Sequence, residues 1–327
     1  MQATARAHAN IALVKYWGKR DLSLNLPAMG SLSVTLDALF TETRVELDRE
    51  LEADELVIDG RRDAMELRRV SRFLDRVRRR AGISLKGRVT SKNSFPSGAG
   101  LASSASGFAA LTLASTAAAG LEMSADELSI LSRLGSGSAP RSLYGGFVEM
   151  RAGRLPSGED AVAVPLVSAG DWPLEVLVVL TSEVKKAVGS TEGMQQSAET
   201  SPFYGAWTAG GCADLEAAQA AVRSRDFELL ARVAERSCLK MHGVMLSTEP
   251  ALVYWNGVTV EVMRAVAVAR RAGTAAFFTI DAGPQVKVVT APGTSRALAA
   301  ELAQIPGVLQ VIATGLGPAA SVLEVSR

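Results

Sequence analysis

The sequence predicts an α+β protein of two domains. Its 327 residues favour more than one folding unit over a single core. Strand-like alternation marks the chain up to about residue 181, and the remainder is mostly helical before three short strands near its end. Strands and helices are therefore segregated rather than strictly alternating, which disfavours a doubly wound nucleotide-binding sheet. We predict domains at residues 1–181 and 182–327.

In the first domain, alternation predicts strands at 43–48 and 83–91, with an arginine-rich helix between them. The apolar stripe of this helix consists of Val70, Phe73, Leu74 and Val77. We interpret its arginines as a solvated face rather than a patch for nucleic acid or lipid. Further helices are predicted at 102–119 and 125–135, and further strands at 145–150 and 174–181.

In the second domain, helical segments are predicted at 208–236 and 252–271. Short apolar strands are predicted at 275–280, 286–290 and 308–314, with a helix at 295–304.

Composition excludes several classes of protein. The 35 Lys and Arg residues balance 34 Asp and Glu, so no global charge indicates nucleic acid or an anionic membrane as partner. Cys212 and Cys238 are too few and too far apart for a disulfide framework and fit a reducing cytoplasm. His8 and His242 do not form a zinc motif, and we expect both to be structural. The N-terminus lacks the pattern of a signal peptide.

An uncharged stretch, "NSFPSGAGLASSASGFAAL", runs from Asn93 to Leu111. It is too rich in Gly, Pro and Ser for a membrane helix and too rich in helix formers for a flexible linker. A strand-like segment leads through Gly98 and Gly100 into a helix whose first turn carries Ser103 and Ser104. Unpaired backbone N–H groups at such a helix start bind phosphate. These residues alone leave two alternatives, a phosphate cradle or a capped, closely packed structural helix.

The segment "PSGAGLASSASG" resembles the phosphate loop of the GHMP kinase superfamily, P-x-x-x-G-L-x-S-S-[AS]. "HANIALVKYWGKRD" at residues 8–21 resembles one branch, the mevalonate diphosphate decarboxylases, and three more stretches agree in the same order. They are "GSGSAPRSLYGGFVEM" at 135–150, "KKAVGSTEGMQQS" at 185–197 and "DAGP" at 281–284. The resemblance implies a two-domain GHMP kinase fold, with a ribosomal-protein-S5-like N-terminal domain and a ferredoxin-like C-terminal domain.

The resemblance also implies roles for individual residues. Asp281 matches the catalytic aspartate, and Arg141 matches the arginine that contacts the substrate carboxylate, a task that suits a planar guanidinium. Implied substrate-binding residues are Tyr16, Lys19, Ser138, Lys186, Ser190 and Thr191. Implied contacts to the phosphates of ATP are Ser97, Gly98, Ala99, Gly100, Leu101, Ala102, Ser103 and Ser104, of which the two last are candidate Mg²⁺ contacts.

The implied reaction is the ATP-dependent decarboxylation of (R)-5-diphosphomevalonate to isopentenyl diphosphate in the mevalonate pathway. ATP is a consumed co-substrate with Mg²⁺, and a cytoplasmic homodimer is expected. Two departures from the family pattern stand out: Ala28-Met29-Gly30, where polar residues are common, and Gln285 in place of Asn. The first departure leaves two alternative activities open: decarboxylation of mevalonate 5-phosphate, or phosphorylation without decarboxylation. A catalytically silent member would lack Arg141, Asp281 or the loop serines, and all are present.

Overall fold

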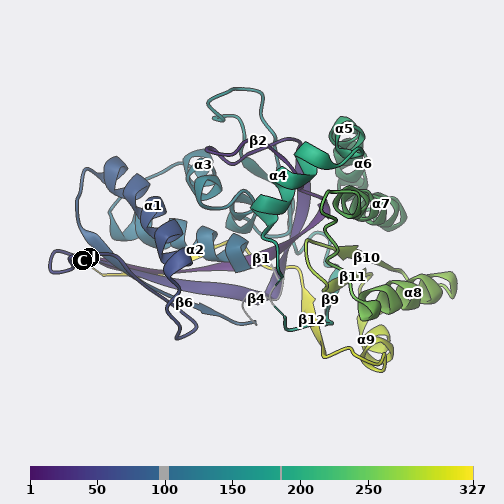
Figure 1. Ribbon diagram of the computed structural model, residues 1–327. Coiled ribbons are helices and arrows are strands. Elements are labelled where there is room, and N and C mark those ends of the chain that lie inside the picture. The colour runs from purple at the N-terminus through teal and green to yellow at the C-terminus, as the bar shows by residue number, and fades with distance from the viewer. Residues whose placement is uncertain (96–102, 185, 327) are drawn as a thin grey trace.

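The computed structural model of the chain describes residues 1–95, 103–184 and 186–326 (Figure 1). Within these residues, strands form a seven-stranded sheet, a four-stranded sheet and a short hairpin. The mixture of helices and sheets agrees with the predicted α+β class.

The seven-stranded sheet is built around two long antiparallel strands, β1 (Gln2–Val14) and β4 (Ser31–Asp48). Its order is β13-β1-β4-β6-β5, with β7 paired to β4 and β8 paired to β7. The other members are β5 (Glu55–Ile58), β6 (Lys86–Asn93), β7 (Phe147–Met150), β8 (Ala163–Val167) and β13 (Ser321–Ser326). Because β13 pairs with the start of β1, the two ends of the chain lie together at one end of this sheet (Figure 1).

Helices from the first half of the chain cover one face of the seven-stranded sheet, and two helices from the second half pack against the other face of β1 and β4. α2 (Ser103–Ala118) packs against β1 and β4, and it is buried because its residues are small and apolar on nearly every side. α1 (Ala64–Ala81) turns Val70, Phe73, Leu74 and Val77 toward the core, as predicted. The remaining elements of this half are α3 (Ala125–Gly135), the 3₁₀ helix η1 (Ala139–Leu143) and the hairpin of β2 (Lys19–Asp21) and β3 (Leu26–Pro27).

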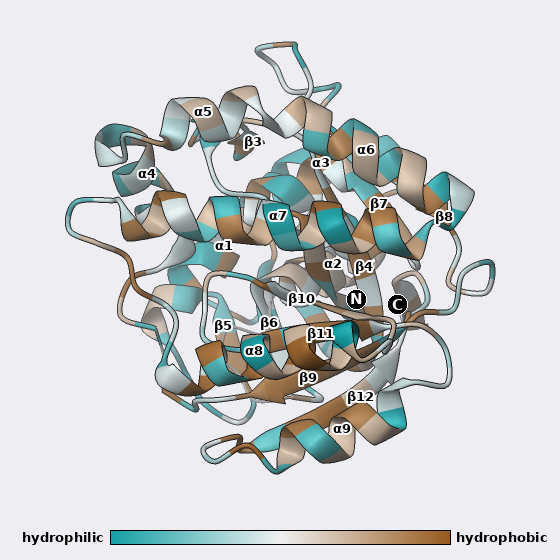
Figure 2. Cartoon of the chain, turned by 90° about the vertical axis from the view of Figure 1, so that its right-hand side faces the viewer, coloured by the Kyte–Doolittle hydropathy of each residue, from teal (hydrophilic) through white to brown (hydrophobic). Residues whose placement is uncertain are grey.

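The four-stranded antiparallel sheet has the order β10-β11-β9-β12. Its strands are β9 (Glu175–Leu180), β10 (Ala276–Ile280), β11 (Val286–Thr290) and β12 (Gln310–Gly315). Alternate residues of β9 point to opposite faces of the sheet. On one face, Leu177 and Val179 pack toward α8 (Gly257–Arg271) and α9 (Ser295–Ala303). These two helices lie side by side and carry both polar and apolar residues (Figure 2). Val176 and Val178 face a core shared with β1 and β4, so the two sheets are joined by continuous apolar packing.

The region predicted to be helical at 208–236 contains more than one helix. The structure has α5 (Tyr204–Ala209), α6 (Gly211–Ser224) and α7 (Phe227–Leu246), preceded by α4 (Ser190–Thr200). Arg225 in a left-handed conformation and the N-cap Asp226 end α6 and begin α7. The sequence patterns also missed β1, which carries much of the first sheet.

The predicted domain boundary after Thr181 stays a prediction. β9, assigned by sequence to the first domain, pairs with β11 and β12 of the four-stranded sheet. No helix within the described ranges is long and apolar enough to span a membrane.

Candidate active site

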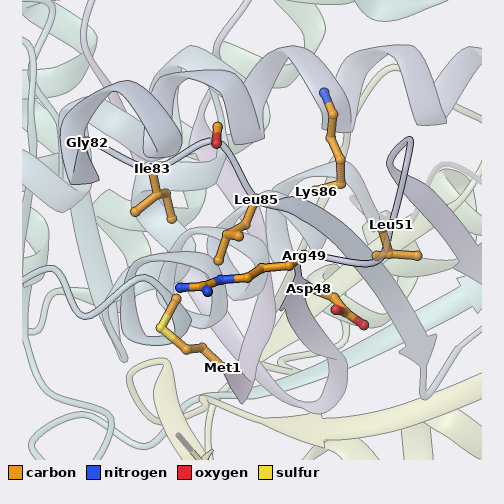
Figure 3. Close-up of a pocket in the computed structure, with 9 residues that line it drawn as sticks. Met1, Asp48, Arg49, Leu51, Gly82, Ile83, Leu85 and Lys86 are labelled. Atoms are coloured by element: carbon orange, nitrogen blue, oxygen red, sulfur yellow. The ribbon is translucent and has the colours of Figure 1, made fainter.

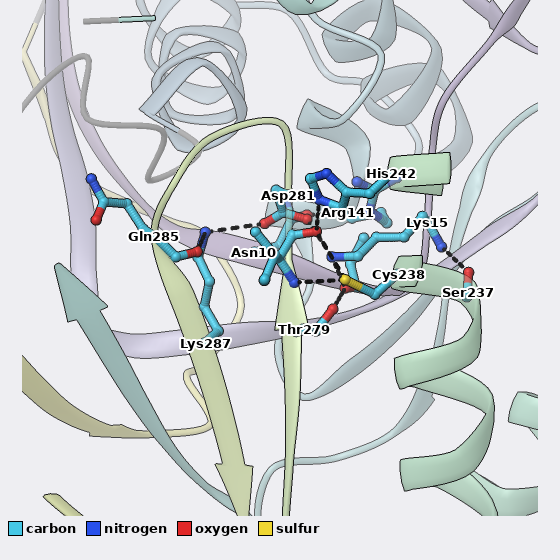
Figure 4. A network of polar contacts seen from close by, with 12 residues as sticks. Asn10, Lys15, Arg141, Ser237, Cys238, His242, Thr279, Asp281, Gln285 and Lys287 are labelled. Atoms are coloured by element: carbon cyan, nitrogen blue, oxygen red, sulfur yellow. Dashed lines mark hydrogen bonds and ion pairs between the residues drawn. The ribbon is translucent and has the colours of Figure 1, made fainter. Parts of the chain in front are cut away.

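Segments from three distant parts of the chain meet where the two sheets adjoin. β1 ends at Val14 and delivers Lys15 and Tyr16, η1 delivers Arg141, and Asp281 follows directly after β10 (Figure 4). The β10–β11 hairpin lies against the β1 end, since the Thr279 hydroxyl donates to the carbonyl of Ala12 at 3.2 Å.

Asp281 is held by two buried lysines (Figure 4). Lys15 Nζ donates to Asp281 Oδ1 at 2.7 Å and to the carbonyl of Ala12 at 2.8 Å. Lys287 Nζ, on β11, lies 3.5 Å from Asp281 Oδ2. Burial by itself would raise the pKa of Asp281, but Lys15, Lys287 and Arg141 together hold that pKa below its ordinary value. The carboxylate is therefore ionised and able to accept a proton.

Arg141 is buried and oriented by neutral partners. Its Nε donates to Asn10 Oδ1 at 3.2 Å, and Nη1 donates to Ser31 Oγ at 2.8 Å. Burial lowers the pKa of Arg141 to about 10, so the guanidinium is charged at neutral pH. No carboxylate among the described residues forms a salt bridge with it, and its remaining N–H groups suit an incoming carboxylate.

Tyr16 lies beside the Arg141 guanidinium, with 5.9 Å between Arg141 Cζ and the ring centroid. The Tyr16 hydroxyl is buried without a hydrogen-bond partner in the described part of the chain. Gly137 makes this approach possible, because a Cβ there would lie 2.3 Å from that hydroxyl. Ser138 is adjacent: its carbonyl accepts from Asn10 Nδ2 at 3.2 Å, and its hydroxyl lies 3.2 Å from Ser136 Oγ.

Two further lysines line the neighbouring surface. Lys19 Nζ donates to Asn25 Oδ1 at 2.7 Å and to Thr191 Oγ1 at 3.1 Å. Burial and the nearby charge of Arg69 lower the pKa of Lys19 to about 8. Lys186 Nζ donates to Ser190 Oγ at 2.6 Å and to the carbonyl of Ala282 at 3.3 Å, next to Asp281.

The phosphate-loop residues Ser97, Gly98, Ala99, Gly100, Leu101 and Ala102 lie outside the described residues, as does Lys185. Ser103 begins α2, and Ser104 is exposed in the same turn. The first turn of α2 has no acidic side chain, so its partial positive charge is not offset locally, which fits a phosphate. In the parts of the chain that are described, no three His, Cys, Asp or Glu residues gather as a metal site.

A separate hollow of about 490 Å³ lies at the other end of the first sheet (Figure 3). It is lined by Met1, Asp48, Arg49, Leu51, Gly82, Ile83, Ser84, Leu85 and Lys86. This hollow lies at the start of β1 and Lys15 follows the end of β1. At ~3.3 Å per residue the strand is about 40 Å long, so the two are far apart. The hollow does not contribute to the cluster around Asp281.

Comparison with known proteins agrees with this geometry. Residues 7–163 match the family described as diphosphomevalonate decarboxylase-like N-terminal domain, and residues 176–312 match the mevalonate 5-diphosphate decarboxylase C-terminal domain. The chain belongs to the diphosphomevalonate decarboxylase family.

Relatives and solved structures cover nearly the whole chain. The diphosphomevalonate decarboxylase of Candida albicans is 36% identical over 97% of this chain and 96% of its own, and that of Homo sapiens is 37% identical over 89% and 77%. The mevalonate diphosphate decarboxylase of Staphylococcus aureus superposes with a TM-score of 0.92 at 38% identity, covering 99% of this chain and 98% of its own. A structure described as MDDEF in complex with MVAPP, AMPPCP and magnesium gives 0.92 at 38%, covering 99% of both chains. These neighbours confirm the predicted GHMP kinase fold.

The two departures from the family pattern have structural explanations. Met29 is buried against α6, where a Cβ on Gly211 would lie 2.4 Å from its Cε. Gly30 is similarly close to α6, because a Cβ there would lie 2.5 Å from Leu215 Cδ2. Gln285 is buried and bridges the strand ends: its Oε1 accepts from Thr181 N, and its Nε2 donates to the carbonyl of Ser182, both at 2.6 Å. All three residues are thus used for packing or for backbone support.

Sequence reasoning missed four polar residues of this site. They are Asn10, Lys15, Ser31 and Lys287. Lys287 had a detectable signal, since it is a lysine inside the apolar strand "VKVVT", where a charge needs a buried partner. Asn10 and Ser31 had no local signal, because their value depends on Arg141 more than 100 residues away.

Proposed function

We propose that the chain catalyses the ATP-dependent decarboxylation of (R)-5-diphosphomevalonate to isopentenyl diphosphate, with release of ADP, phosphate and CO₂. The observation that carries the proposal is an ionised aspartate close to an arginine that forms no salt bridge with a carboxylate of residues 1–95, 103–184 and 186–326. A substrate with both a hydroxyl and a carboxylate can place one at each group. The neighbour described with MVAPP, AMPPCP and magnesium supports the same substrate classes.

The chemistry follows from the leaving group. A tertiary hydroxyl leaves poorly, so its oxygen first takes the γ-phosphoryl group of ATP while Asp281 accepts the hydroxyl proton. Departure of phosphate leaves positive charge on the tertiary carbon, and the electron pair of the C–CO₂ bond moves in as CO₂ is released. Arg141 orients the carboxylate before this step, and the negative charge of Asp281 stabilises the cationic carbon.

The remaining site residues bind the rest of the substrates. Tyr16, Lys19, Ser138, Lys186, Ser190 and Thr191 surround the diphosphate end, where two lysines offset its charge. The loop at 97–102, with Ser103 and Ser104, binds the phosphates of ATP. Mg²⁺, when bound there, neutralises charge on the transferred phosphoryl group, and the two serine hydroxyls are its candidate protein contacts.

Three organisational features complete the proposal. The chain acts as a homodimer and in the cytoplasm, in line with its family and with its two free cysteines. It has two domains, residues 1–181 and 182–327, and β9 at the end of the first pairs with β11 and β12 of the second.

The test measures ADP and CO₂ released by purified protein with ATP, Mg²⁺ and either 5-diphosphomevalonate or 5-phosphomevalonate. We expect one CO₂ per ADP and a strong preference for the diphosphate, with Asp281→Ala inactive. Preference for the monophosphate, or ADP without CO₂, would reassign the substrate or the reaction while keeping the fold. Near-normal CO₂ release by Asp281→Ala would contradict the role of the aspartate.

A further inference from the structure

The two carboxylate oxygens of Asp281 have different surroundings. Oδ1 accepts a hydrogen bond from Lys15 Nζ at 2.7 Å. Oδ2 is buried and has no hydrogen-bond partner in the described part of the protein. Lys287 Nζ lies 3.5 Å from Oδ2, close enough for an ion pair but too long for a strong hydrogen bond. Oδ2 therefore keeps its capacity to accept a proton while a cation lies beside it.

Lys287 occupies an unusual position for a lysine. It lies within β11, where every residue is buried, and it is only 2% exposed. Its backbone pairs with Thr279 on β10, two residues before Asp281. Burying an ammonium group is costly unless an opposite charge compensates it, and Asp281 is that charge. An apolar side chain would suit the strand better, so the lysine serves the aspartate rather than the core.

We propose that Lys287 is a positioning residue that keeps the Asp281 carboxylate ionised and fixes its rotation, so that Oδ2 is the atom that receives the substrate proton. The inference rests on the proposed function and specifies one atom of it. With Lys15 on Oδ1 and Lys287 beside Oδ2, the carboxylate is restrained from two sides.

The proton step balances without a change in Lys287. The O–H bond of the substrate hydroxyl breaks as its oxygen bonds to the γ-phosphorus, and the proton moves to Oδ2. Lys287 stays protonated throughout. A second cation close to the carboxylate weakens it as a base, so the benefit of Lys287 lies in orientation and ionisation rather than in base strength.

Other titratable groups also act on Asp281, and the test takes them into account. Lys15, Arg141 and Lys186 add positive charge from the β1 end, η1 and the segment before α4. α7 contributes His242, whose pKa is lowered to about 3 by burial, and Cys238, whose pKa is raised to about 11 by burial. Both are neutral across pH 5–8, so Lys287 can be varied without a titrating neighbour on α7.

The experiment compares Lys287→Met and Lys287→Arg with the wild type, using the CO₂-release assay from about pH 3.5 to pH 9, so that the range reaches below the ordinary pKa of an aspartate. Lys240→Met is the matched control, because it removes a lysine whose Nζ lies 2.5 Å from Asp214 Oδ2, between α6 and α7. For Lys287→Met we expect kcat to fall at least about tenfold, while KM for both substrates changes less than about threefold. The acid limb of the kcat–pH profile of Lys287→Met should lie at least about one pH unit above that of the wild type, since one cation beside the aspartate is gone. The thermal midpoint of Lys287→Met should fall less than that of Asp281→Asn, because Asp281 keeps its ion pair with Lys15.

The arginine variant separates positioning from simple structural support. Lys287→Arg keeps the charge, so it should retain the wild-type acid limb and recover part of kcat. A kcat for Lys287→Met within twofold of wild type would overturn the proposal. So would a loss of activity with an unmoved acid limb that Lys287→Arg does not recover. An inactive wild type would instead refute the proposed function, so the two failures are distinguishable.

Discussion

Replacement of Asp281 by Asn tests whether the carboxylate supports the fold as well as the chemistry. The side chain keeps its size but loses the charge that compensates Lys15 and Lys287, which are 1% and 2% exposed. Removing one partner of a buried ion pair typically costs about 3–5 kcal/mol. A lysine can escape by losing its proton, which at pH 7 costs at most about 5 kcal/mol from an ordinary pKa near 10.4. Because the Asp281 side chain is 25% exposed, we expect the free energy of unfolding to fall by the lower end of that range, about 3 kcal/mol.

The pH dependence of this loss has a definite sign. The pKa of Asp281 is lower in the folded chain than in the unfolded chain, so its stabilising effect is present above about pH 4 and is lost as pH falls through the folded pKa. The difference in unfolding free energy between wild type and Asp281→Asn should therefore be constant from about pH 5 to 8 and narrow in acid. Above pH 9 it should narrow again, as the lysines of the variant lose their protons.

Urea unfolding at a series of pH values measures this difference. Asp75→Asn is the control, because its carboxylate pairs with Arg78 at 2.6 Å but its side chain is 56% exposed, and it should lose less than about 1 kcal/mol. Asp281→Asn should also lose CO₂ release by more than about 10²-fold. If Asp281→Asn were as stable as wild type at pH 7, the two lysines would not depend on the aspartate, and the account of the site would be wrong.

Three further predictions concern the rest of the site. Gly137→Ala should displace Tyr16 and lower the free energy of unfolding by about 1–3 kcal/mol. The loss should be smaller in a Tyr16→Phe background, which lacks the clashing hydroxyl, and a double-mutant cycle measures the interaction energy between the two positions. Equal losses in both backgrounds would contradict the predicted clash. The affinity for a diphosphate ligand, measured by calorimetric titration, should weaken as pH rises above about 8, where Lys19 loses its charge. Lys19→Arg should remove this pH dependence, because arginine keeps its charge. An affinity of the wild type that does not change with pH would mean that Lys19 does not bind the diphosphate. Gly30→Ala should lower the thermal midpoint, because the added Cβ clashes with the Leu215 side chain. The preference for the diphosphate over the monophosphate substrate should stay unchanged. An altered preference would show that Gly30 lines the substrate pocket.

Much of this protein could be predicted from sequence because the signals are local. The α3 bounds, 125–135, were predicted correctly since the acidic residues Asp126 and Glu127 of its first turn and the terminal Gly135 are local signals. The family motifs led to Tyr16, Ser138, Arg141 and Asp281, which lie close together, and to Lys19, which contacts Thr191. Their roles stay proposals. β1 was missed although apolar and polar residues alternate from Gln2 to Ile11, because most of its apolar residues are alanines, which are weak strand formers.

Sequence alone determined the family, the α+β class and the residues that carry recognisable motifs. Only the tertiary structure decided how those residues are supported: Lys15 and Lys287 on opposite oxygens of Asp281, and Asn10 and Ser31 on Arg141. A charge or an amide in the sequence shows its chemistry but not its neighbours. The pairing of Lys15 with Asp281 joins residues 266 positions apart, and burial of such groups is tolerated only when folding brings the partners together.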